Sequence, residues 1–118
     1  MKKLLLTVVA LMMSGTVSFA RPKTSRTYTG EIMDSTCAKM GNHDAGYKLT
    51  NTNTAKDCTV ACSKTGAKFV LYNATRKVTY ELDDQDKARG FAGQKVKVIG
   101  AYDATDKTIH VEKIEASS

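Results

Sequence analysis

The residues best suited to chemistry are three cysteines and one histidine in a short part of the chain: Cys37, His43, Cys58 and Cys62. Thiolate sulfur and imidazole nitrogen are the usual ligands of structural zinc, and this set has the composition of a Cys₃His site. The same thiols could instead form a disulfide or carry thiol redox chemistry. The sequence therefore predicts a centre built on sulfur and leaves three chemistries open.

The number and spacing of the cysteines favour the disulfide. Three cysteines allow at most one intramolecular bond and leave one free thiol. We expect Cys37 to pair with Cys58 or Cys62, because two cysteines on successive turns of one helix seldom meet disulfide geometry. The distance from Cys37 to Cys58 is not a standard zinc-finger spacing. Redox chemistry is the weakest hypothesis, since no Cys-x-x-Cys motif is present.

One helix must position two of these thiols. Thr54 is a good N-cap with an acidic residue three positions later, and Gly66 suits the position after a helix end. The pattern predicts a helix over Ala55–Thr65. Cys58 and Cys62 are four residues apart and therefore share one face of this helix.

The other two residues follow the first predicted strand, Tyr28–Ser35. Cys37 lies just beyond the strand end, and His43 falls in a predicted loop over Ala38–Asn53. Loops of this length in compact domains are usually functional or disordered. Asp34 could orient a ligand or cap the loop, and capping is the preferred role.

The remainder of the chain alternates short apolar-polar segments with turn signals, which indicates strands. A short helical turn is expected between Asp83 and Gly90, with Phe91 and Ala92 entering the core. The predicted fold class is mostly β, with one or two short helices. We expect a small five-stranded OB-like barrel over residues 28–118, with the Cys-bearing helix inserted after strand 1. Its later strands are Lys68–Tyr72, Lys77–Leu82, Gln94–Tyr102 and Thr108–Ile114.

The N-terminal segment has the features of a secretory signal peptide over residues 1–20. Lys2 and Lys3 precede an apolar run, Leu4–Met13, which is too short to span a membrane. Small residues in Val17–Ala20 suit cleavage after Ala20. The prediction is an exported, periplasmic or extracellular protein with a flexible leader over 21–27 and no stable membrane anchor after cleavage.

Charge and motifs exclude several function classes. The formal net charge of +6 falls to +4 without Lys2 and Lys3, a mild excess that does not favour nucleic acid as a partner. No Ser-His-Asp set, phosphate-binding glycine loop or pair of catalytic carboxylates is evident. The Asp83–Asp86 acids lack the glutamate that a calcium loop needs, and a helix N-terminus explains them better. His110 is expected on the surface of the last strand.

Four parts of the sequence form a further pattern: Gly30–Cys37, His43, Lys56–Lys68 and Phe91–Gly100. Together they resemble a family of small exported bacterial proteins of unknown function. The resemblance implies an OB-like barrel, an exported location and a Cys…His…Cys-x₃-Cys pattern, and it implies no activity.

The predicted function is that of an exported binding or interaction module for an unidentified protein or small ligand. Its Cys/His element is expected to be structural, with no cofactor. The alternative is a zinc-binding Cys₃His protein or an enzyme with thiol or metal chemistry. The lack of another catalytic constellation favours the module.

Overall fold

The computed structural model describes residue 15 and residues 24–117. The predicted signal peptide, except Gly15, and residues 21–23 of the predicted leader therefore lie outside the described residues. The elements follow one another as β1 (Ser25–Asp34), α1 (Ser35–Met40), α2 (Asp44–Thr50), α3 (Ala55–Lys64), β2 (Phe69–Asn73), β3 (Val78–Leu82), α4 (Gln85–Arg89), β4 (Lys95–Asp103) and β5 (Thr108–Ala116).

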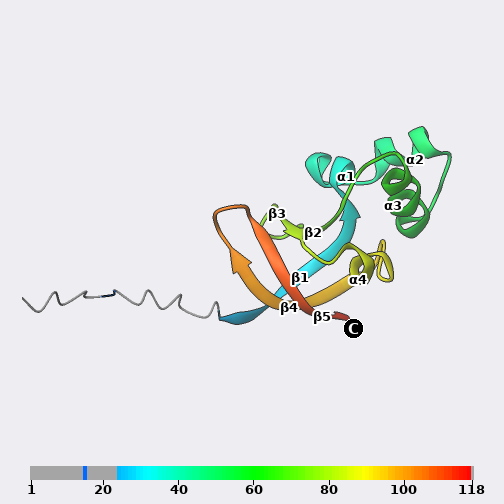
Figure 1. Ribbon diagram of the computed structural model, residues 1–118. Helices are drawn as coiled ribbons and strands as arrows, with labels where there is room; N and C mark the ends of the chain where they lie inside the picture. Colours follow the sequence, from blue (N-terminus) through cyan, green and yellow to red (C-terminus); the bar gives the residue numbers. More distant parts are fainter. Residues whose placement is uncertain (1–14, 16–23, 118) are drawn as a thin grey trace, which may run out of the picture.

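The five strands form a closed barrel in the order β1-β2-β3-β5-β4 (Figure 1). The long strand β1 pairs with two strands: Ser25–Glu31 pairs with β4, and Glu31–Asp34 pairs with β2. β3 and β5 are parallel, and the other pairs are antiparallel. The mostly β, five-stranded, OB-like fold class is confirmed.

Successive side chains of β1 point to opposite faces of the strand, and each face contributes to a different apolar core. Ile32 points into the barrel, and its neighbour Met33 points outward beneath the helices. The barrel interior contains Ile32, Phe69, Leu71, Tyr80, Leu82, Ala88, Ala92, Val96, Val98, Ile109 and Ile114. The outer core contains Met33, Cys37, Ala38, Cys58, Cys62 and Val70. All three cysteines thus lie between the outside of the barrel and the helices.

Helices α1, α2 and α3 form a helical insertion (residues 35–64) between β1 and β2, and they lie together at one end of the barrel (Figure 1). The predicted Cys-bearing helix is confirmed: Thr54 caps it by accepting from the Asp57 N–H, and Gly66 follows it with φ +104°. The region 38–53 was predicted as a loop, and that was wrong. It contains the second half of α1 and all of α2, and these helices are followed by Gly41 and Asn51 in left-handed conformations.

Two further details differ from or extend the sequence prediction. β1 begins at Ser25, so residues 25–27 belong to the barrel and not to a flexible leader. The short helix α4 lies between β3 and β4, and the Ala92 side chain that follows it is buried in the barrel, as expected. Within the described ranges, no helix has the length and hydropathy needed to cross a membrane.

Candidate metal centre

Asp34 performs a local structural task with only one of its two carboxylate oxygens. Oδ1 accepts hydrogen bonds from the N–H groups of Thr36 at 3.0 Å and Cys37 at 2.8 Å, which caps α1 at its first turn. Oδ2 is buried and has no hydrogen-bond partner among the described residues. Because a buried carboxylate oxygen without a partner is costly, Oδ2 is a candidate ligand atom.

His43 likewise has a hydrogen-bond partner at only one of its two ring nitrogens in the described structure. It immediately precedes α2, its Nε2 lies 2.8 Å from Oε1 of Glu31, and its ring stacks on Tyr47 with centroids 5.7 Å apart. Its Nδ1 is buried and finds no partner in the part of the chain that the structure describes. Edge and face contacts therefore fix the ring while one nitrogen stays available.

The two unpartnered atoms belong to residues of one cluster with two thiols. One ligand atom from each of Asp34, Cys37, His43 and Cys58 lies within 4.8 Å of the others. The Sγ atoms of Cys37 and Cys58 are 4.0 Å apart. A tetrahedral zinc ion holds its ligand atoms roughly 3.3–3.8 Å apart, given bonds of about 2.0–2.3 Å. The cluster needs only a small contraction to bind such an ion.

Four different elements supply the four residues: Asp34 ends β1, Cys37 lies in α1, His43 precedes α2, and Cys58 lies in α3. Of the predicted metal set, Cys37, His43 and Cys58 are brought together. Cys62 lies one turn beyond Cys58 in the same outer core but outside the group of four. Asp34 takes the fourth place. The sequence does not show that one carboxylate oxygen of Asp34 caps α1 while the other, Oδ2, has no partner among the described residues.

The predicted disulfide from Cys37 to Cys58 or Cys62 is not formed. All three described cysteines are free thiols, and the 4.0 Å between the Cys37 and Cys58 sulfurs is about twice the length of an S–S bond. From the sequence, Cys37 was expected just beyond the end of the first predicted strand, before the predicted loop. Cys37 instead lies in the first turn of α1, where the Asp34 cap fixes its backbone.

The protein groups around the cluster disfavour negative charge on sulfur. Burial, followed by the nearby Asp34 carboxylate, raises the pKa of the Cys37 thiol far above its ordinary value. Burial, followed by the charge of Asp34, raises the pKa of Cys62 to about 11. A bound cation reverses this preference, because it stabilises thiolate and carboxylate together.

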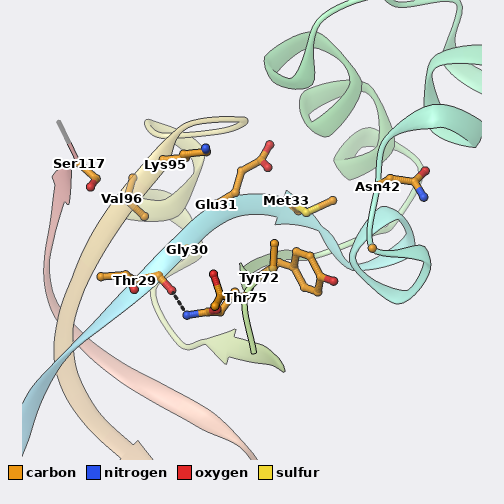
Figure 2. A pocket seen from close by; sticks show the side chains of 13 residues that line it. Thr29, Gly30, Glu31, Met33, Asn42, Tyr72, Thr75, Lys95, Val96 and Ser117 are labelled. Atoms are coloured by element: carbon orange, nitrogen blue, oxygen red, sulfur yellow. Dashed lines mark hydrogen bonds between the residues drawn. The ribbon is translucent and has the colours of Figure 1, made fainter. Parts of the chain in front are cut away.

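The centre is closed to solvent. The side chains of Asp34, Cys37 and Cys58 are fully buried, and His43 is nearly so. A groove of about 290 Å³ lies beside it on the outer face of β1. Figure 2 shows Glu31, Met33 and Tyr72 among the side chains that line this groove, and none of the four clustered residues lines it. A closed site with four protein ligands is typical of structural metal sites.

The other candidates of the sequence are surface features. His110 is exposed on β5, as predicted, and its Nδ1 lies 3.1 Å from Oδ2 of Asp83. Asp84 caps α4 by accepting from the Lys87 N–H, which agrees with the helix-terminus interpretation of these acids.

Comparison with known families gives one match. The family model for a protein of unknown function (DUF5818) matches residues 63–117. This segment covers the last two residues of α3, strands β2 to β5 and α4. All four clustered residues precede it. No curated protein and no solved structure matches the chain.

Proposed function

We propose that this protein binds one divalent transition-metal ion, zinc by its ligand chemistry, as a structural centre. The ligands are Oδ2 of Asp34, Nδ1 of His43 and the sulfurs of Cys37 and Cys58. The observation that supports this most directly concerns two buried side-chain atoms that have no partner among residues 24–117, Asp34 Oδ2 and His43 Nδ1. Both belong to residues of the same cluster.

The donor set favours zinc. Two thiolates, one imidazole and one carboxylate combine soft and borderline ligands, which suits zinc and does not suit calcium or magnesium. A divalent cation also compensates most of the charge of two thiolates and a carboxylate in a buried site. Since the ligands come from β1, α1, α3 and the start of α2, binding energy becomes folding energy for the helical insertion.

We further propose that the whole molecule is an exported binding module, with the metal centre supporting its helical insertion. The enclosure of the centre by protein argues for a structural role over catalysis. The basic, apolar and small-residue pattern of residues 1–20 supports export. Intact mass of protein from the cell envelope or medium is expected to fit a chain beginning at Arg21; a chain retaining Met1 contradicts export.

The metal proposal is tested by elemental analysis and cobalt spectroscopy. Protein purified under reducing conditions is expected to contain about one equivalent of zinc, and its Co²⁺ form is expected to show thiolate-to-cobalt charge transfer and tetrahedral ligand-field bands. Cys37→Ser, Cys58→Ser and His43→Ala should each lose zinc. His110→Ala, which removes the exposed histidine, is the matched control. Zinc-free wild type that also fails to bind added Co²⁺ contradicts the proposal.

A disulfide is the second candidate for the same residues. The 4.0 Å contact between the Cys37 and Cys58 sulfurs favours it in protein that has lost its ion and met an oxidant. Thiol titration of the unfolded, unreduced protein separates the two states. Three titratable thiols with stoichiometric zinc support the metal centre, and one titratable thiol without zinc supports the disulfide.

A further inference from the structure

Glu31 lies on the outer face of β1, three residues before Asp34 in the chain. Its Oε1 is 2.8 Å from Nε2 of His43, and the two side chains are 23% and 10% exposed, respectively. The contact joins residues twelve positions apart, and it is the one hydrogen bond of the imidazole within the described part of the chain. It therefore controls the edge of the ring that faces away from the free nitrogen.

A neutral imidazole carries one N–H and one lone pair, and its neighbours decide which nitrogen holds which. A carboxylate accepts hydrogen bonds only, so contact with Glu31 places the proton on Nε2. The lone pair then belongs to Nδ1, the buried nitrogen without a partner. A metal needs this lone pair, and it cannot bind the nitrogen that carries the proton.

We infer that Glu31 is a positioning residue for the metal centre: it selects the His43 tautomer that exposes the Nδ1 lone pair and holds the ring in the binding orientation. The inference rests on the proposed function. Stacking of the ring on Tyr47, at 23° between planes, restrains the ring face, while Glu31 restrains its edge. Carboxylates behind a ligating histidine commonly have this role, and losing one typically weakens metal binding roughly 10- to 100-fold.

Glu31 can be changed without opening the core. Its side chain is partly exposed and lines the groove on the outer face of β1 (Figure 2), whereas its neighbours Ile32 and Met33 are buried. Thr29 is the matched control: it lies two residues earlier on the same face of β1, lines the same groove and is exposed. No hydrogen bond between the Thr29 side chain and His43 is present in the described structure.

The first measurement reads the tautomer in metal-free protein. Two-bond ¹H–¹⁵N correlation spectra of histidine-labelled protein distinguish Nδ1–H from Nε2–H directly. Wild type and Thr29→Ala are expected to show His43 protonated at Nε2. Glu31→Ala is expected to show a mixture, with the backbone amide spectrum otherwise unchanged. His43 protonated at Nδ1 in wild type, or a tautomer unchanged in Glu31→Ala, overturns the inference.

The second measurement is zinc affinity by competition with a chromophoric chelator. Glu31→Ala should bind roughly 10- to 100-fold more weakly, and Thr29→Ala should bind like wild type. Glu31→Gln keeps an oxygen that can accept from Nε2–H and should fall between wild type and Glu31→Ala. Wild type that binds no zinc contradicts the proposed function, whereas wild type and Glu31→Ala that bind equally well contradict the role of Glu31.

Discussion

A methyl group on the α-carbon of Gly46 would lie 2.6 Å from the Sγ atom of Cys58. The same position is 2.6 Å from the Cys37 sulfur. The backbone of α2 thus closes directly over both thiols, at a distance that only glycine permits. The close packing of α2 on the two sulfurs therefore requires glycine at position 46.

Gly46→Ala is expected to destabilise the protein, although glycine-to-alanine changes usually favour helices. The added methyl group must push α2 away from the sulfurs, and such overpacking costs about 1–3 kcal/mol. Zinc affinity should fall as well. Urea unfolding and chelator competition measure the two effects. Gly90→Ala is the control, because its added methyl group would lie 3.6 Å from the Lys87 carbonyl oxygen, at ordinary contact distance. Equal behaviour of both variants would refute the steric argument.

Asp34→Asn should separate the two tasks of this residue. Asparagine keeps an oxygen that can accept from the Thr36 and Cys37 N–H groups, but it replaces Oδ2 with an NH₂ group that cannot ligate a metal. In chelator, the free energy of unfolding should change by no more than about 1 kcal/mol, the typical value of a cap. With zinc, the variant should lose most of the stabilisation that wild type gains. Thermal unfolding with and without zinc measures both, and a full zinc response in Asp34→Asn would remove Oδ2 from the ligand set.

The sequence predicted the barrel and α3 because both depend on local signals. The cap at Thr54, the glycine at position 66 and the two-residue alternation of the strands act over a few residues. Helices α1 and α2 carry no comparable apolar period. Cys37 and Ala38 bury α1 in the outer core, and Tyr47 of α2 packs against the same core. That is why the segment was expected to be a loop.

The sequence predicted only part of the candidate site. Residue type alone identified Cys37, His43 and Cys58, because few side chains have that chemistry. Asp34 and Glu31 became visible only through geometry: one has an oxygen without a partner, and the other contacts a histidine twelve residues away. The preference for a disulfide followed from the number and spacing of the cysteines, and these do not place two sulfurs at bonding distance.

Metal-free protein is expected to lose stability as the pH rises above 9. The pKa of Cys62 is about 11 in the folded protein and 9.0 ordinarily, so the unfolded chain releases its proton first. Between these values the folded state binds more protons, and the free energy of unfolding falls by on the order of 1 kcal/mol per pH unit. The stabilisation is fully present below pH 9. Urea unfolding in chelator from pH 7 to 11 measures the slope. Cys62→Ser should show a shallower decline, and an identical slope would contradict the raised pKa.

Removal of zinc should loosen the helical insertion and spare the barrel. The barrel has its own apolar core around Leu71, Val98 and Ile109, whereas the outer core consists largely of the cysteines and the residues they contact. Local opening depends on the contacts that each unit makes for itself. In hydrogen exchange with a chelator, the amides of α1 and α3 should therefore exchange faster, while those of β4 and β5 should stay protected. Cys58→Ser should show the fast pattern with or without zinc, and Thr29→Ala should follow wild type. Uniform acceleration across the insertion and the barrel would mean that the two unfold as one unit, and that the ion does not act on the insertion alone.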